Sequence, residues 1–202
     1  MYPILLTILC TPYVSSHEIP KVEMKMWQLY DLLNTTKRIW ILSISQPVIY
    51  EGKEAECINY RTKNLTTTDV TLLYKVVLVK EVRKFKVNAT IQTYTYPTYP
   101  SMKMKDWNGI NVVKVLIYWG YFSRCGIFFV MSEDDPHAVP WCEVHVQGPQ
   151  LRAAYSRPPY SYTACDKKFY ELCGQHRKQI FLAHTGCPNV TMPELPNAGN
   201  GR

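Results

Sequence analysis

Seven segments of this chain are rich in β-branched and aromatic residues, and turn-prone stretches separate them. The segments are residues 38–45, 54–61, 69–80, 84–96, 109–122, 125–131 and 141–147. Such residues suit the pleated, half-buried surface of a strand. Stretches such as 50–53, 97–100 and 132–136 carry the Gly, Pro, Asp and Ser that form turns. The pattern predicts an antiparallel meander of about eight strands, and closing it into a barrel would remove its exposed edges.

Some of these strands are apolar on both faces, and residues 112–119 (VVKVLIYW) are the clearest case. A one-sided sheet would alternate apolar and polar positions. A barrel with a lined interior and an element packed on its outside buries both faces. The pattern therefore favours a barrel with a covered outer wall.

Two helices are predicted, one on each side of the strands. Val22–Leu33 has apolar residues at helical spacing, and Asn34 is a natural stop. Residues 161–174 follow a Pro-rich loop, with Ser161 or Thr163 as the N-cap and Gly174 as the end. The expected fold is mainly β: a single-domain eight-stranded antiparallel barrel with an N-terminal and a C-terminal helix.

The first sixteen residues have the features of a secretory signal. Residues 1–16 carry no charged side chain, contain the apolar run Ile4–Cys10 and end in small residues. We expect cleavage near Ser16, a folded domain over 17–189 and a loose tail over 190–202. No stretch is long enough for a membrane anchor, so we expect secretion. N-glycosylation sequons fit an exported chain and stand at Asn34, Asn64, Asn88 and Asn189.

The cysteine count agrees with export. Seven cysteines become six once Cys10 leaves with the signal, and an even count in an exported chain predicts three disulfides. Sequence alone leaves fifteen connectivities open. The histidines do not stand at zinc-site spacing, so we expect no metal site.

Charge and motifs narrow the function. The net charge of +7 attracts anions, but the basic residues are scattered and the densest stretch, Lys80–Lys86, is typical of a solvated turn. No nucleic-acid-binding motif accompanies it. No nucleophile, zinc-protease or phosphate-loop motif appears either. We therefore expect a binding protein, not an enzyme, without a cofactor and without nucleic-acid or membrane partners.

The cysteines and their neighbours resemble the tick salivary lipocalins of the histamine-binding-protein family. The frame is Cys125-Gly126-Ile127, fifteen residues, Glu143-Val144-His145, nineteen residues, then Cys165. Its spacing fits the amine-binding members, but Gly126, Val144 and His145 replace the family's Asp, Leu and aromatic residue. The resemblance implies a lipocalin-type barrel with Cys57–Cys187 and Cys125–Cys165 disulfides, which leaves Cys142 with Cys173.

The resemblance also implies the function: a secreted, monomeric salivary scavenger of a small host mediator. A biogenic amine such as histamine or serotonin is the ligand typical of the family. A lipid mediator, such as an eicosanoid or a fatty acid, is the better chemical fit and is the ligand that we expect to be favoured, because Gly126 and Gln46 stand where acids are expected. Lys114 or Arg124 would then pair with its carboxylate. The candidate ligand-binding residues are Gln46, Tyr50, Lys114, Trp119, Phe128, Glu143 and His145, each weighed against ordinary barrel packing or solvent exposure.

A second class of function stays open. Some tick lipocalins inhibit host proteins of complement or clotting through surface loops, and such loops leave no motif. The positive charge and the exposed aromatic residues would suit such a contact.

Overall fold

The computed structural model describes residues 19–20, 22–79, 81–94, 98–155, 163–174 and 178–187. The predicted signal, the sequon at Asn189, the N-cap candidate Ser161 and the tail 190–202 lie outside these residues. The side chains of the other three sequon asparagines, Asn34, Asn64 and Asn88, are exposed.

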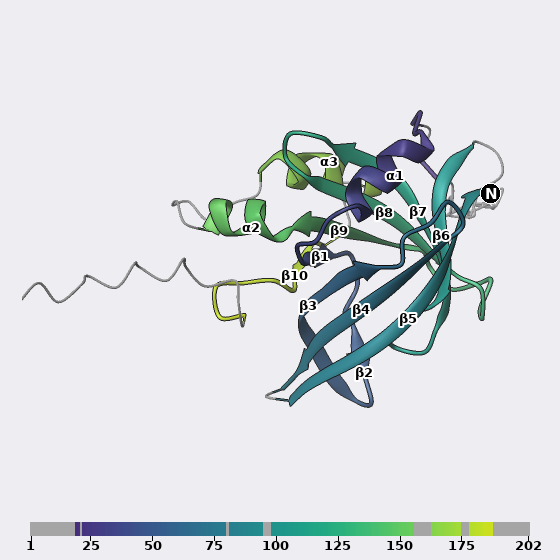
Figure 1. Cartoon of the computed structure of the whole chain (residues 1–202). Coiled ribbons are helices and arrows are strands. Elements are labelled where there is room, and N and C mark those ends of the chain that lie inside the picture. Colours follow the sequence, from purple (N-terminus) through teal and green to yellow (C-terminus); the bar gives the residue numbers. More distant parts are fainter. Residues whose placement is uncertain are drawn as a thin grey trace, which may run out of the picture.

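Eight antiparallel strands close into a barrel (Figure 1). Each strand pairs with its neighbours in chain order, and β1 pairs with both β3 and β9 to close the ring. The strands are β1 (Ile39–Ile44), β3 (Lys53–Lys63), β4 (Asp69–Leu78), β5 (Glu81–Tyr94), β6 (Tyr99–Lys105), β7 (Asn111–Gly120), β8 (Cys125–Ser132) and β9 (Trp141–Gln147). Two short strands add to it, since β2 (Ile49–Tyr50) pairs with β3 and β10 (Ile180–Phe181) pairs with β1. The predicted mainly β barrel is confirmed.

Three helices within the described residues pack on this barrel. They are α1 (Met26–Leu33), α2 (Gly148–Tyr155) and α3 (Thr163–Cys173). The fully buried Leu29, Leu32 and Leu33 of α1 belong to the core inside the barrel, so α1 covers one end (Figure 1). Helix α3 contacts the outside of β7, β8 and β9 and ends at Gly174, whose φ of 99° suits glycine.

The structure corrects the prediction in four places. Helix α1 begins at Met26, whereas the prediction began it at Val22. Residues 97–100 were expected to form a turn, but β6 begins at Tyr99 and is the eighth strand of the barrel. Helix α2 occupies residues expected to be a loop; its Pro149 lies in the first turn, where a helix needs no N–H donor. The segment around Lys80–Lys86 is not a turn throughout, because β5 begins at Glu81.

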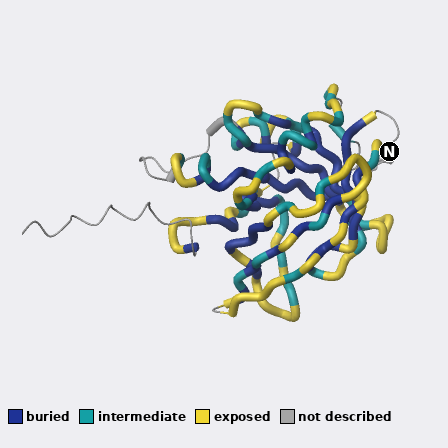
Figure 2. The backbone as a smooth tube through the Cα atoms, viewed as in Figure 1, coloured by how far each residue is buried: buried dark blue, intermediate teal, exposed yellow. Residues whose placement is uncertain are grey.

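Two hydrophobic cores explain the strands that are apolar on both faces. Val112 and Leu116 of β7 point into the barrel, whereas Val113, Val115 and Ile117 face a second core outside it. The outer core includes Phe169 of α3 and the six disulfide cysteines. In Figure 2, β7 to β9 are correspondingly buried along most of their length, whereas exposed stretches lie in turns and along parts of β3 to β5.

Three disulfides tie the outer elements to the barrel. Cys57 in β3 pairs with Cys187, Cys125 in β8 with Cys165, and Cys142 in β9 with Cys173. These are the pairs that follow from the family resemblance. Their Cα atoms lie 5.3, 6.4 and 6.2 Å apart, within the ordinary range for such bridges. None of the described helices has the length and apolar character that a membrane span requires.

Candidate functional site

A cavity of about 520 Å³ opens at the end of the barrel opposite α1. It lies between the β1–β2 connection, the β6–β7 loop and the β8–β9 loop, and we call it the open-end cavity. Its apolar wall is formed by Ile41, Ile44, Pro47, Val48, Ile49, Ile58, Trp107, Ile110, Ala138, Val139, Trp141 and Leu182. A cavity of this size and polarity is typical of small-molecule sites.

The charged residues that line this cavity are all acidic. They are Asp106, Asp134, Asp135 and Glu143, and no Lys, Arg or His is among the described lining residues. Hydrogen bonds from the side chain and backbone of Asn111 hold the pKa of Asp134 below its usual value, which keeps this carboxylate ionised. The lining favours a cation over an anion.

A buried ion cluster lies at the inner side of the cavity. The fully buried ammonium of Lys114 lies 2.7 Å from Asp106 Oδ2 and 2.9 Å from Glu143 Oε2. Trp141 donates its indole N–H to Glu143 Oε1 at 3.0 Å, and the backbone N–H of Trp107 donates to Asp106 Oδ1 at 2.8 Å. Both carboxylates therefore have charged and neutral donors.

His145 and Tyr60 extend the cluster into the barrel. His145 Nε2 lies 2.8 Å from Glu143 Oε2, and its Nδ1 lies 2.9 Å from the hydroxyl of Tyr60. A neutral imidazole with its proton on Nε2 satisfies both contacts: it donates to the carboxylate and accepts from the phenol. All three side chains are buried, so this arrangement leaves none of these atoms unpaired.

Burial and neighbouring charges shift the pKa values in this cluster. Burial lowers the pKa of His145, which stays neutral at physiological pH. Burial alone would raise the pKa of Glu143, but the Lys114 charge and the His145 hydrogen bond hold it below its ordinary value. For Lys114, the two carboxylates outweigh burial and raise the pKa. The cluster thus holds two negative charges and one positive charge.

Aromatic packing fills the barrel beyond the cluster. The ring of Phe128 lies 4.6 Å from that of His145, and the rings of Tyr60 and Tyr74 are 5.1 Å apart. All of these side chains are buried. These rings occupy the barrel interior beyond the cluster.

The structure brings four of the seven predicted site residues to this region. Gln46 and Glu143 line the cavity, and Lys114 and His145 lie behind it. The other three do not line the cavity. Tyr50 packs against Phe85 and Trp107, Trp119 donates to Asp31 of α1 at 2.9 Å, and Phe128 stacks inside the barrel.

Lys114 and Arg124, the expected partners of a lipid carboxylate, are both engaged by acids. Lys114 holds two carboxylates, and Arg124 pairs with Asp31 at 3.0 Å near α1. Neither lines the open-end cavity.

Sequence reasoning missed Asp106, Trp107 and Trp141. Asp106 follows the overlooked strand β6, in a Lys-Asp-Trp-Asn-Gly stretch that has turn character. A buried Lys114 in an apolar strand was the available signal, because a buried ammonium needs carboxylate partners.

The pKa shifts predict that the protein loses stability in acid. His145 and Glu143 both titrate below their ordinary values of 6.5 and 4.5 in the folded state. The unfolded chain therefore takes up protons first as the pH falls, and stability that is complete above pH 7 declines through 6.5 and further below 4.5. Urea unfolding at pH 7.5, 5.5 and 4.0 measures this decline. His145→Gln keeps a donor for Glu143 but has no imidazole to titrate. In this variant the loss of unfolding free energy between pH 7.5 and pH 5.5 should shrink. A loss as large as in wild type would contradict the lowered pKa of His145.

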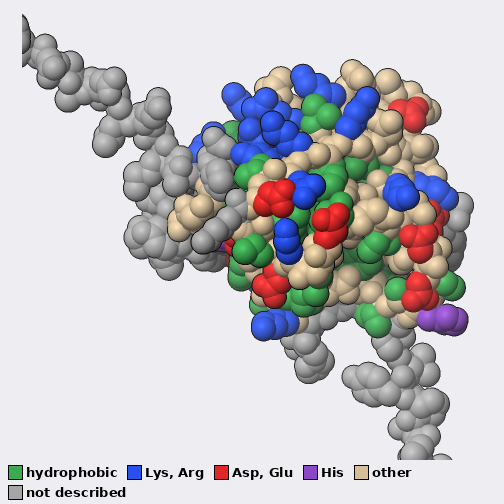
Figure 3. Space-filling model, turned by 90° about the horizontal axis from the view of Figure 1, so that it is seen from below, with side chains coloured by type: hydrophobic (Ala, Val, Ile, Leu, Met, Phe, Trp, Pro, Cys, Tyr) green, Lys and Arg blue, Asp and Glu red, His purple; other side chains and the backbone are tan. Residues whose placement is uncertain are grey.

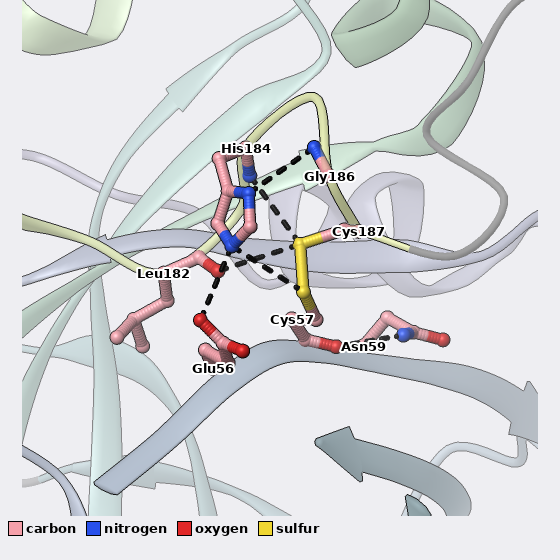
Figure 4. Close-up of a disulfide and its surroundings, with 7 residues drawn as sticks. All are labelled: Glu56, Cys57, Asn59, Leu182, His184, Gly186 and Cys187. Carbon is pink, nitrogen blue, oxygen red and sulfur yellow. Dashed lines mark hydrogen bonds and ion pairs between the residues drawn. A yellow bond between two sulfur atoms is a disulfide. The ribbon is translucent and has the colours of Figure 1, made fainter. Parts of the chain in front are cut away.

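One further cluster has the composition of a metal site. His184 Nε2 lies 3.7 Å from Cys57 Sγ and 3.2 Å from Glu56 Oε2, close to the Cys57–Cys187 disulfide (Figure 4). Both sulfur atoms are committed to the disulfide, and metal binding needs free thiolates. The cluster is structural: its disulfide links the C-terminal segment to β3.

A closed eight-stranded antiparallel barrel, covered at one end by a helix and hollow at the other, defines a lipocalin-type ligand-binding fold. A family model described as "Tick histamine binding protein" matches residues 22–188. The chain belongs to this family. A search of curated proteins gave no significant match.

A solved structure shares the fold at low sequence identity, and two others are similar with lower scores. A crystal structure of AM182 in complex with serotonin is 15% identical, with a TM-score of 0.55 over 83% of this chain and 97% of that chain. The siderocalin Ex-FABP is 12% identical, with a TM-score of 0.46 over 70% of this chain and 85% of that chain. Apocrustacyanin C2 is 9% identical, with a TM-score of 0.47 over 84% of this chain and 93% of that chain.

Proposed function

We propose that this protein binds one small cationic amine in the open-end cavity and sequesters it outside the cell. The observation that carries the proposal is the cavity lining: four acids, no described basic side chain, and the two indole side chains of Trp107 and Trp141. Carboxylates stabilise a partly desolvated ammonium group, and indole faces add cation–π attraction. A histamine- or serotonin-like amine has this chemistry and fits the family.

The charge balance behind the cavity supports the same ligand. Asp106 and Glu143 carry two negative charges, and Lys114 neutralises one of them. One negative charge remains in a poorly solvated place, where a ligand ammonium would balance it. A lipid carboxylate would add a second uncompensated negative charge. We therefore rank an amine above an eicosanoid or a fatty acid.

The biological role that we infer is that of a secreted scavenger. The three disulfides suit an extracellular protein. Binding of an inflammatory or vasoactive amine would lower its free concentration at a feeding site and weaken the host response. This role needs stoichiometric binding and no catalysis.

Replacing Asp106 by Asn should weaken amine binding without weakening the binding of a neutral analogue. The substitution removes the net negative charge of the cluster, which we expect to cost the ammonium at least 2 kcal/mol, about thirtyfold in Kd. Titration calorimetry with serotonin and with 5-hydroxytryptophol, which has a hydroxyl in place of the amine, separates charge from shape. Equal losses for both ligands would mean that Asp106 acts only through the shape of the cavity.

Native mass spectrometry tests the ligand class. Protein secreted from insect cells is stripped of lipid and then offered histamine, serotonin, leukotriene B4 and arachidonate. We expect one amine per chain and no retained lipid. Retention of leukotriene B4 or arachidonate in preference to both amines would reverse the ranking.

A further inference from the structure

Five basic residues gather on the outer face of β3 to β5 and just before β1, and none of them lines the open-end cavity. They line a single shallow depression together with Leu73, Tyr74 and Phe85, and no acid is among its lining residues. We call this set the basic face: Arg38, Arg61, Lys75, Lys84 and Lys86. They are distant in sequence, and only the strand pairing makes them neighbours. Figure 3 shows Lys and Arg side chains gathered toward the upper left of the molecule.

The strand register places these cations in two rows that cross the sheet. In one row, Arg61 pairs with Leu73, and Leu73 pairs with Lys86. In the next row, Lys75 stands directly opposite Lys84. Like charges directly opposite on one face destabilise a sheet.

Arg38 extends the second row. Lys75 also pairs with Asn59 of β3, and the Arg38 guanidinium donates to Asn59 Oδ1 at 2.8 Å. Each row therefore has a basic group near β3 and another on β5.

No partner within the described chain relieves this repulsion. Among the described residues, none of the five side chains forms an ion pair, whereas Lys53, Lys103 and Lys168 each pair with a glutamate. Burial and the neighbouring charge of Arg61 lower the pKa of Arg38, which fits an uncompensated positive field. An external polyanion would supply the missing charge.

We propose that the basic face binds a linear sulfated polysaccharide of the glycosaminoglycan class. The outward side chains of the two rows are flexible cations around one exposed leucine, which suits the sulfate and carboxylate groups of such a chain. Single-stranded nucleic acid would need exposed aromatic rings for base stacking. Tyr74 is buried in the barrel, and Phe85 packs against Tyr50 and Trp107. Leu73 alone offers little apolar surface for insertion into a membrane.

Such binding would keep the protein on the extracellular matrix while the open-end cavity stays free. The two surfaces use different residues and opposite charge. Loss of one activity therefore need not affect the other, and the failure of either proposal leaves the other standing.

The test compares two double variants that remove the same charge. Lys84→Gln/Lys86→Gln removes two cations of the basic face. Lys167→Gln/Lys178→Gln removes two exposed cations, one from α3 and one just before β10. Asn88 is exposed on β5 close to Lys86, so all proteins are treated with an endoglycosidase before use. Binding to immobilised heparin is measured between 0.05 and 0.4 M NaCl, with a single-stranded oligonucleotide and phosphatidylserine vesicles as the other surfaces.

We expect wild type to bind heparin at 0.15 M NaCl with a steep salt dependence. The Lys84/Lys86 variant should bind about tenfold more weakly and with a shallower salt slope, because two counterion-releasing contacts are lost. The Lys167/Lys178 variant should change less than twofold. If both variants lost heparin affinity equally, net charge alone would explain the binding, and the proposal would be overturned. Stronger binding to the oligonucleotide or the vesicles than to heparin would overturn the choice of partner.

Discussion

Lys114→Met is expected to destabilise the protein by about 3–5 kcal/mol, the largest effect of any single substitution considered. Methionine has a similar length, so the barrel loses little packing. It leaves Asp106 and Glu143 buried with no cation between them, and removing one partner of a buried ion pair typically costs this much. Urea unfolding at pH 7.5 measures the loss.

A matched variant and an added ligand make this prediction specific. Lys103→Met breaks an exposed pair with Glu133 and should cost less than about 1 kcal/mol. The ammonium of Lys114 acts as a tethered cation for the two carboxylates, so n-propylammonium should stabilise Lys114→Met more than it stabilises wild type, in which Lys114 already neutralises one of the two negative charges. If Lys114→Met were as stable as wild type, the two carboxylates would not depend on this charge.

Loss of the Cys57–Cys187 disulfide should impair both stability and ligand binding. The bridge spans 130 residues, and removing it through Cys57→Ala/Cys187→Ala should cost about 3–5 kcal/mol. It also holds the segment whose Leu182 lines the cavity, where the backbone of Leu182 bonds to Leu42 and Cys57. Amine affinity should therefore fall with stability.

The Cys125–Cys165 disulfide provides the control. It spans 40 residues and ties α3 to the start of β8, away from the cavity. Cys125→Ala/Cys165→Ala should lower stability by a similar amount and leave the affinity for serotonin unchanged at a temperature where both variants are folded. Equal affinity in the two double variants would show that the C-terminal segment does not shape the site.

The barrel could be predicted because the local sequence of most strands is typical of β structure. β-branched runs and turn residues located seven of the eight barrel strands, and the double-sided burial of β7 indicated an outer layer. Strand β6 escaped because Pro97 and Pro100 indicate a turn, whereas pairing with both β5 and β7 makes residues 99–105 a strand. Tertiary pairing outweighed the local signal there.

The site was less predictable because its charges depend on strand register and on loop position. The pattern identified Glu143, but nothing in the sequence states that Lys114 and Asp106 meet it inside the barrel. Asp106 reaches Lys114 only because the β6–β7 hairpin folds it back. The basic face was missed for the same reason: Arg61, Lys75 and Lys84 appear scattered along the chain, and the register makes them neighbours.

A crystal structure of the protein soaked with serotonin tests the central claim most directly. The account predicts one amine per chain in the open-end cavity, with its ammonium directed at Asp106 and Glu143 and its ring between Trp107 and Trp141. An empty cavity at saturating serotonin, or an amine that displaces Phe128 and Tyr60 deep in the barrel, would contradict it.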